Sequence, residues 1–191
     1  MRDLVVTQNI TVDGVIDASE GWFTVGDDAV DDADIVAELM THTAACDAVL
    51  FGRVTFEQMR GYWPEQTDDK TGITDDLNEM SKYVVSGSLG DPGWRNSVVL
   101  RGLDEVRALK EQPGRDIVST GSITLVHALI AADLVDEYRL FVYPVVVGHG
   151  ARLFVDGTAV PALRLVESKP FRSGVVLLRY RTTSTEGAPA R

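Results

Sequence analysis

Short apolar runs alternate with segments of helical periodicity along the first two thirds of the chain. The apolar runs are rich in valine, isoleucine and leucine, as in strands that are buried on both faces. Between them, apolar residues recur at steps of three and four, which is the period of an amphipathic helix. Strands that alternate with helices imply βαβ units and a largely parallel sheet. The predicted strands are residues 3–12, 47–51, 83–85, 98–100 and 116–119, and the predicted helices are residues 31–46, 53–60, 73–80, 103–109 and 123–130.

The pattern changes in the last third of the chain. Residues 137–147 form one long β-rich run, and Pro144 within it favours a bulge or a sheet edge. Residues 163–167 and 175–181 alternate apolar and polar positions, which is typical of an antiparallel pair. The pattern therefore predicts an α/β protein with antiparallel strands at its C-terminal end.

Length and composition indicate one domain of a soluble protein. The chain has 191 residues, of which 45% are apolar and 25% charged. We expect residues 1–182 to form a single domain and residues 183–191, which are small and polar, to form a flexible tail. A single cysteine, Cys46, excludes an internal disulfide framework and a Cys-rich zinc site. With no signal-peptide pattern and no apolar run long enough to span a bilayer, the sequence predicts a cytoplasmic protein.

The net charge limits the classes of partner. A formal charge of −11 argues against a large nucleic-acid surface, because phosphate binding requires clustered Lys and Arg. The same charge leaves room for one local basic pocket that holds a nucleotide. His42, His127 and His149 show no metal-ligand spacing, and no metal site is predicted.

Three predicted strands end at glycine- or hydroxyl-rich junctions. The strand at 116–119 runs into Gly121 and Ser122 just before a helix begins. Such a junction exposes backbone N–H groups and the positive end of a helix dipole, and both favour a phosphate. Similar junctions occur at residues 52–55 and 86–88. In open α/β sheets, ligands bind at this edge, although three ordinary βα turns remain the alternative.

Each junction supplies groups that a dinucleotide can use. Arg53 offers a planar fork of donors to phosphate, and Thr55 offers a hydroxyl near a helix start. Ser86 and Ser88 offer further hydroxyls, and Gly121 offers bare backbone. The usual GxGxxG, GxxxxGK[ST] and GxSxG motifs are absent, so the sequence excludes the common dinucleotide, NTPase and hydrolase fingerprints.

The motifs, taken in order, resemble a known family. Gly52-Arg53-Val-Thr55-Phe56 resembles the Gly-Arg-x-Thr-aromatic motif of dihydrofolate reductases, and residues 11–16 (TVDGVI) resemble their first-strand motif. The C-terminal segments 134–137 (LVDE) and 144–154 (PVVVGHGARLF) resemble stand-alone relatives of the reductase domain of bacterial riboflavin-pathway deaminase–reductases. This similarity spans nearly the whole chain.

The resemblance implies a dihydrofolate-reductase-like fold, a mixed and mainly parallel sheet flanked by helices. It also implies NADPH as hydride donor and a homodimer formed through the long C-terminal strands. The implied cofactor-binding residues come from several strand ends: Asn9, Gly14, Ile16, Gly52, Arg53, Thr55, Ser86, Ser88, Gly121, Ser122 and Leu125.

The substrate side is less determined. Trp22 and Phe23, on the loop at residues 17–32, are expected to border the substrate as a lid or pocket wall. Relatives place one acid on the first helix, and here Asp34 is preferred because it begins the apolar helix. The competing acids are Asp27, Asp28, Asp31, Asp32 and Glu38. A riboflavin-pathway substrate carries a ribose phosphate, and no second basic cluster is evident in the sequence to hold it.

The sequence therefore predicts a reductase that transfers hydride from NADPH to a pteridine-, flavin- or pyrimidine-like heterocycle. Such a reaction needs two flat rings held face to face with water excluded. The alternative is a nucleotide-binding dimer without chemistry that acts as a sensor or scaffold. Turnover on an added heterocycle separates the two hypotheses.

Overall fold

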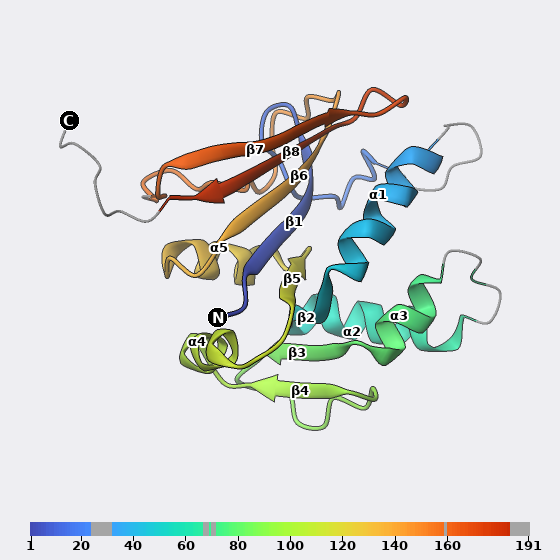
Figure 1. Cartoon of the computed structure of the whole chain (residues 1–191), viewed down its shortest axis with the longest axis vertical. Helices are drawn as coiled ribbons and strands as arrows, with labels where there is room; N and C mark the ends of the chain where they lie inside the picture. The colour runs from blue at the N-terminus through green and yellow to red at the C-terminus, as the bar shows by residue number, and fades with distance from the viewer. Residues whose placement is uncertain (24–31, 67–68, 70–71, 159, 184–191) are drawn as a thin grey trace.

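The computed structural model (Figure 1) describes residues 1–23, 32–66, 69, 72–158 and 160–183. The predicted tail, apart from Thr183, lies outside the described residues, as do residues 24–31 of the predicted loop. Three of the competing acids, Asp27, Asp28 and Asp31, fall in that part.

The strands form one eight-stranded sheet in the order β4-β3-β2-β5-β1-β6-β8-β7. The pairs from β4 through β6 are parallel, whereas β8 runs antiparallel to both β6 and β7. This confirms the predicted α/β class with a mainly parallel sheet and an antiparallel C-terminal end. The strands are β1 (Leu4–Thr11), β2 (Cys46–Gly52), β3 (Ser81–Val85), β4 (Ser97–Leu100), β5 (Asp116–Thr120), β6 (Glu137–Tyr143), β7 (Leu163–Pro170) and β8 (Val176–Thr182).

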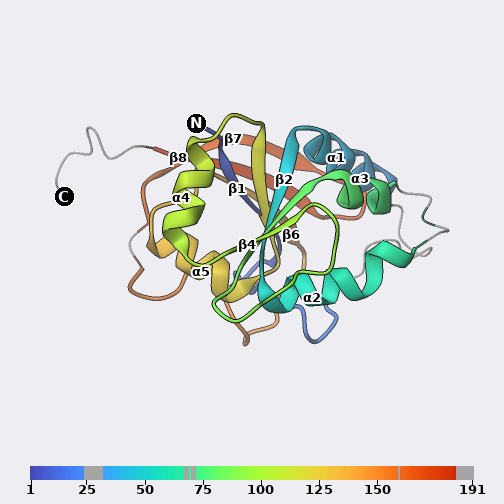
Figure 2. The ribbon, with the colours of Figure 1, turned by 90° about the horizontal axis from the view of Figure 1, so that it is seen from below.

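Helices cover both faces of the sheet, as Figure 2 shows. On one face, α4 and α5 pack over the central strands. On the other face lie α1, α2 and α3, so that each βα junction places its helix start at the same edge of the sheet. The helices are α1 (Ala33–Ala44), α2 (Arg53–Tyr62), α3 (Ile73–Glu79), α4 (Leu103–Glu111) and α5 (Ile123–Ala131), with a short 3-10 turn at Trp63–Glu65.

The hydrophobic core differs between the two faces. Under α4 and α5 it is one continuous cluster that includes Leu4, Leu50, Ile117 and Leu129. Under the other helices it divides into two clusters. One joins α1 to β6 and β8, and the other joins α2 and α3 to β2 and β3. The central strands β5 and β1 run between these two clusters, and this division bears on the candidate site.

The last predicted parallel strand is shorter than expected. β6 ends at Tyr143, not at residue 147, and Pro144 lies just beyond it. Proline cannot donate to the strand ladder, so it terminates the pairing and does not form a bulge within the strand. The chain then turns back over the first-strand loop, where Val15 and Arg152 form an isolated bridge.

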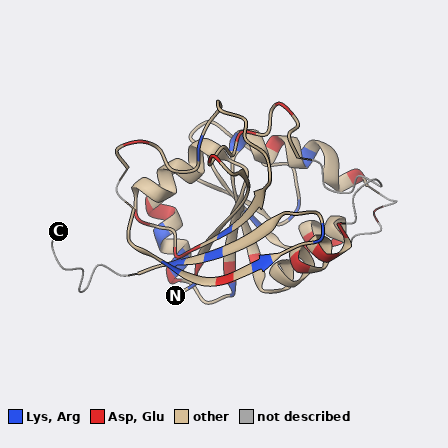
Figure 3. Cartoon of the chain, turned by 90° about the horizontal axis from the view of Figure 1, so that it is seen from above, with Lys and Arg blue, Asp and Glu red and all other residues tan. Residues whose placement is uncertain are grey.

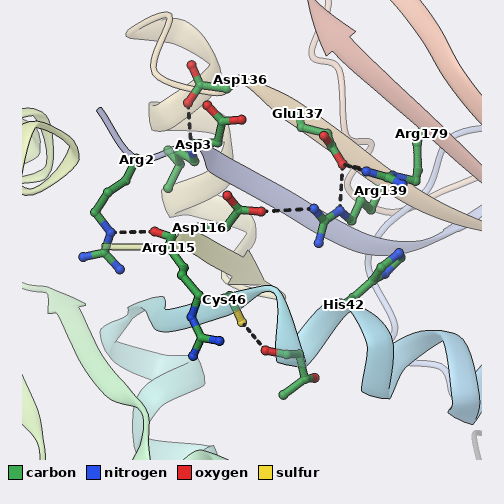
Figure 4. A network of polar contacts seen from close by, with 12 residues as sticks. Arg2, Asp3, His42, Cys46, Arg115, Asp116, Asp136, Glu137, Arg139 and Arg179 are labelled. Atoms are coloured by element: carbon green, nitrogen blue, oxygen red, sulfur yellow. Dashed lines mark hydrogen bonds and ion pairs between the residues drawn. The ribbon is translucent and has the colours of Figure 1, made fainter. Parts of the chain in front are cut away.

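Charged residues of both signs are dispersed over the helices and outer strands, as Figure 3 shows. A buried network lies at the amino ends of the central strands (Figure 4). Arg139 donates to Glu137 at 2.7 Å and approaches Asp116 at 3.3 Å, and Arg179 donates to the same glutamate at 2.9 Å. Burial alone would raise the pKa of Glu137, but the hydrogen bonds from these two arginines hold that pKa below its usual range.

The described helices include none that is both long and apolar enough to cross a membrane.

Candidate functional site

The tips of β2 and β5 are joined by two reciprocal hydrogen bonds. The backbone N–H of Gly52 donates to Ser122 Oγ at 2.9 Å, and the N–H of Ser122 donates to Thr55 Oγ1 at 3.0 Å. Each hydroxyl oxygen therefore accepts from backbone and keeps its own proton for another partner. These bonds hold residues from two junctions, far apart in sequence, in one rigid unit.

Two helix starts converge at this unit. α2 begins directly after Gly52 and α5 directly after Ser122, and neither N-cap residue makes a side-chain capping bond. The first-turn N–H groups of both helices therefore have no capping side chain as acceptor. The positive ends of the two helix dipoles also lie close together. This arrangement favours an anion, and a pyrophosphate in particular.

A cleft of about 800 Å³ lies over these helix starts. Its volume is within the range of small-molecule and cofactor sites. Among the charged residues that line it, the described part of the chain supplies one cation, Arg53, and one anion, Asp17. The cleft brings together seven of the residues predicted to bind cofactor: Ile16, Gly52, Arg53, Thr55, Gly121, Ser122 and Leu125.

Gly121 occupies a position in the cleft that strongly favours glycine. Its φ is +58°, and a Cβ atom there would lie 3.3 Å from Thr55 Cγ2. Its carbonyl oxygen accepts from Gln8 Nε2 at 2.8 Å, which fixes the peptide plane at the end of β5. Gln8 was missed in the sequence analysis; its signal is an amide in the polar run Thr7-Gln8-Asn9, directly after the buried apolar start of the strand, and in the fold it is buried. The backbone at Gly121 is thereby held open to a ligand.

Arg53 is exposed, and its guanidinium can leave its present partner to bind a ligand. Its guanidinium forms an ion pair with Glu57 at 2.8 Å, one helical turn along α2. An exposed pair of this kind contributes only about 0.3–0.5 kcal/mol. Exchange of the carboxylate for a phosphate therefore costs little.

The tips of β3 and β4 extend the same edge of the sheet. Gly52 pairs with Val85, and Val85 pairs with Leu100, so the three strand ends are in register. The residue after Val85 is Ser86, whose buried hydroxyl oxygen accepts from the N–H of Leu89 at 2.9 Å. Ser86 therefore shapes its own turn, while Ser88 is exposed. Neither serine lines the cleft described above.

Arg101 is a cation at this edge that the sequence analysis missed. It follows β4, and its Nη1 donates to the carbonyl oxygens of Ser86 at 3.0 Å and Leu89 at 2.9 Å. The signal available in the sequence was an arginine directly after a predicted strand. Arg101 and Ser88 thus lie at neighbouring strand ends.

The first-strand loop is tied to the segment at residues 144–154. The Asp13 carboxylate accepts from the N–H groups of Gly148 at 2.8 Å and Val147 at 3.3 Å. A hydrogen bond from Thr11, together with these backbone donors, lowers the pKa of Asp13 to about 2. These bonds fix the loop that carries Gly14 and Ile16. Of the predicted nicotinamide contacts, Ile16 lines the cleft, whereas Asn9 and Gly14 do not.

A second, smaller cavity of about 170 Å³ lies between α1 and α3, in the gap between the two core clusters. Thr7 and Thr120, which pair across β1 and β5, form part of its floor. Thr120 lines this cavity and the next residue, Gly121, lines the larger cleft. The two linings share no residue, and they come next to each other in the chain at the tip of β5. Sequence patterning did not reveal the cavity, because its lining residues have the periodicity of core.

Trp22 and Phe23 form an aromatic cluster with Tyr143 at the end of β6. The ring centroids of Trp22 and Tyr143 are 5.6 Å apart, and those of Phe23 and Tyr143 are also 5.6 Å apart. Trp22 Nε1 donates to the carbonyl of Asp17. The two predicted substrate residues thus hold the loop against the sheet, and neither lines the two spaces described above.

Asp34, the preferred candidate acid, ties α1 to the turn between β7 and β8. Its carboxylate accepts from the backbone N–H of Arg172 at 3.0 Å. That hydrogen bond lowers the pKa of Asp34 and favours the ionised form. Asp34 lines neither space, and its role as the first-helix acid of the site stays a prediction.

Glu38 and His42 lie one helical turn apart on the buried side of α1. Glu38 Oε1 is 3.0 Å from His42 Nε2, and its other oxygen accepts from Lys169 at 2.6 Å. Burial, followed by the nearby charge of Arg139, lowers the pKa of His42 to about 4, so the imidazole is neutral at pH 7. His42 contributes to the wall of the smaller cavity, but its ring nitrogens are buried away from solvent.

No group of His, Cys, Asp and Glu side chains within the described ranges is arranged to hold a metal ion.

Comparison with protein families gives one match over almost the whole chain. The model of the RibD C-terminal domain matches residues 2–177. Two proteins of Bacillus subtilis strain 168, both described as uncharacterized, are similar along their full lengths. YyaP is 30% identical over 186 residues, with 94% of each chain covered. YwjB is 29% identical over 181 residues, with 92% of this chain and 96% of YwjB covered.

Solved structures show the same fold at low identity. A protein from Shewanella sp. PV-4, provisionally named for riboflavin biosynthesis, superposes with a TM-score of 0.66 at 14% identity, over 95% of this chain and 99% of that one. A pyrimidine reductase-like protein from Corynebacterium diphtheriae superposes with a TM-score of 0.64 at 15% identity, over 95% of this chain and 92% of that one.

Proposed function

Because this chain belongs to the family of RibD C-terminal domains, we propose that it is an NADPH-dependent reductase of a small heterocycle. The observation that carries the proposal is the cleft over the starts of α2 and α5, beside which Thr120 lines a second, smaller cavity. The larger cleft has the groups that a dinucleotide needs, and the smaller cavity has the size of a ring. Thr120 and Gly121, adjacent in the chain, separate them.

The residues present fit a dinucleotide phosphate. Two uncapped helix starts, the exposed Arg53 and the bare backbone of Gly121 line one cleft, and a side chain at Gly121 would fill the cradle. The hydroxyls of Ser122 and Thr55, whose oxygens already accept from backbone, donate their protons to phosphate oxygens. Arg101 and Ser88, at the adjoining strand tips, hold the adenosine-side phosphate that distinguishes NADPH from NADH.

When bound, reduced nicotinamide supplies a hydride to an electrophilic ring carbon. The chain contributes position and exclusion of water. Gln8 holds the peptide of Gly121 so that the floor between the two rings is rigid. The apolar walls of the smaller cavity keep water from the reacting face. Water at the mouth supplies the proton, since neither Asp34 nor the buried ring nitrogens of His42 reach the cavity.

We further propose that the protein is a cytoplasmic homodimer. Leu165 and Val166 are 50% and 42% exposed on β7, the outer strand of the sheet. An unpaired strand edge with exposed apolar side chains favours association with a second copy. The free thiol of Cys46 is buried, which suits a reducing compartment. Light scattering of wild type and Val166→Lys tests the dimer, which the substitution is expected to dissociate.

The function is tested by fluorescence titration with NADPH, followed by addition of candidate pterins and pyrimidines. We expect saturable binding and oxidation of NADPH. Arg53→Ala is expected to weaken NADPH binding about tenfold, which corresponds to about 1.4 kcal/mol, and to weaken NADH binding to a similar extent, because both cofactors carry the pyrophosphate. Arg107→Ala is the matched control, because Arg107 is exposed on α4 and lines neither space. Binding without turnover on any heterocycle would favour the non-catalytic sensor, and unchanged binding in Arg53→Ala would remove that residue from the site.

A further inference from the structure

We propose that the cavity between α1 and α3 selects an uncharged, planar ring that carries no phosphate or carboxylate. The inference rests on the proposed function, because it names the substrate class of the same reductase site. It excludes a ring with a phosphorylated sugar as the favoured substrate.

The size of the cavity limits the ligand to one ring or two fused rings. Its volume is about 170 Å³. A dry protein cavity of about 150 Å³ is enough to bind benzene. A sheet floor and the helices α1 and α3 bound this space, and a planar ring is the ligand that we expect in it.

The walls are almost entirely apolar. Side chains of α1, α3 and the sheet floor surround the ring position, and the polar side chains among them are three threonines, His42 and Asp76. Because apolar walls do not compensate a lost hydration shell, a charged group placed there costs several kcal/mol more than a neutral one. The apolar lining residues are Leu39, Val49, Ile73, Leu77, Met80 and Val118.

The charges near the mouth are acidic. Among the described lining residues there is no Lys or Arg, and the exposed carboxylate of Asp76 on α3 lines the cavity. His42 adds no positive charge, because burial keeps its imidazole neutral at pH 7. A phosphate or carboxylate on the ring would meet Asp76 without a compensating cation.

An adjoining groove of about 440 Å³ extends the same pattern. It shares Thr43, Cys46, Asp76 and Met80 with the cavity and adds the carboxylates of Asp47 and Glu79, which are ion-paired with Arg2 and Arg95. Its one described cation is Arg115, whose Nη1 already donates to the carbonyl of Ala44 at 2.8 Å. A substituent that leaves the cavity by this route passes the carboxylate of Asp76, so a neutral or cationic substituent suits the groove better than an anionic one.

The test compares two fluorescent probes that differ by one charge, pterin and pterin-6-carboxylate. Each is titrated into the full chain, with and without NADP⁺. We expect pterin to bind about tenfold or more tightly than the carboxylate. Asp76→Arg is expected to remove this preference. Asp75→Arg is the matched control, because Asp75 is the exposed neighbour on α3 and does not line the cavity.

Two further variants test whether the probe binds in the cavity. Val118→Phe fills the floor and Leu77→Phe fills the α3 wall, so that the result does not depend on either substitution alone. Both are expected to abolish pterin binding and to leave the NADPH affinity within about twofold. Equal or tighter binding of the carboxylate by the wild-type protein overturns the inference, as does the failure of pterin to bind. NADPH binding without the ring preference contradicts this inference alone, whereas ring preference without NADPH binding contradicts the proposed function alone.

Discussion

The backbone N–H of Gly52 donates to Ser122 Oγ at 2.9 Å and thereby joins the tips of β2 and β5. Ser122 is at the N-cap position of α5, with a left-handed φ of +49°, yet its side chain does not cap its own helix. Its hydroxyl oxygen serves the neighbouring junction. The start of α5 is left with free first-turn donors, and the two junctions become one site.

Replacing Ser122 is expected to affect stability and cofactor binding together. Ser122→Ala leaves the N–H of Gly52 without its acceptor, which costs about 1–3 kcal/mol. It also removes a hydroxyl from the cleft. We expect a lower Tm and an NADPH Kd raised about tenfold, measured by thermal unfolding and fluorescence titration. Ser168→Ala, at an exposed position on β7, is expected to change neither; a Ser122→Ala protein with wild-type affinity would contradict the site.

Gly121→Ala is expected to damage the cleft through both strain and contact. A positive φ of a non-glycine residue costs about 1–2 kcal/mol, and here the new Cβ would also lie 3.3 Å from Thr55 Cγ2. NADPH affinity is expected to fall by at least about tenfold. Gly157→Ala separates the two effects, because Gly157 also has a positive φ, of +80°, but has open space around it. Equal loss of NADPH affinity in both variants would show that backbone strain, and not the contact with Thr55 in the cleft, causes the loss.

Glu137→Ala is expected to destabilise the fold without weakening the site. The glutamate is 3% exposed and compensates the buried Arg139 at the edge of the sheet opposite the cleft (Figure 4). Removing one partner of such a pair typically costs about 3–5 kcal/mol. Denaturant unfolding measures the loss, and NADPH titration of the folded protein is expected to give the wild-type Kd. Glu79→Ala, which breaks only an exposed pair with Arg95, is expected to cost less than about 1 kcal/mol.

The buried His42 predicts a specific loss of stability in acid. Its pKa falls from 6.5 in the unfolded chain to about 4 in the fold, so the folded state binds the proton less well. The contribution is fully present above pH 6.5 and is lost as pH falls from 6.5 through 4. One pKa unit corresponds to about 1.4 kcal/mol, so the effect is on the order of 3–4 kcal/mol.

The measurement is the free energy of unfolding against pH for wild type and His42→Gln. The side chains that face His42 are Glu38 on its own helix and Arg139, Arg179 and Glu137 on the sheet. A glutamine amide does not titrate in this range, so the variant is expected to show a flatter dependence between pH 6.5 and pH 4. Parallel curves for the two proteins would assign the acid loss to the carboxylates instead.

The parts of the fold that the sequence predicted are those where one local signal sufficed. Buried runs such as residues 116–119 and the helix at residues 123–130 have a clear period, and the order of strands and helices implied the parallel sheet. The end of β6 was misplaced because residues 145–147 are β-branched. Pro144, which cannot donate to the ladder, outweighs that propensity.

The sequence predicted site residues only where a glycine or a charged residue follows the end of a predicted strand. Gly52, Arg53 and Gly121 stand out because strands end there, and they do line one cleft. The cavity between α1 and α3 was not predictable. Leu39, Leu77 and Val118 have ordinary core periodicity, and the gap arises because two separate clusters form on one face of the sheet. Likewise, Trp22 and Phe23 pack on Tyr143, a contact between distant segments that local pattern does not contain.

The central claim is that the strand tips at Gly52 and Gly121 cradle a phosphorylated nicotinamide cofactor. A crystal structure of the protein with NADPH tests it most directly. The account predicts the pyrophosphate at the starts of α2 and α5 beside Arg53, with the nicotinamide ring against Thr120 and Gly121 at the mouth of the smaller cavity. A nucleotide bound on another face, with the cleft over these helix starts filled only by water, would contradict it.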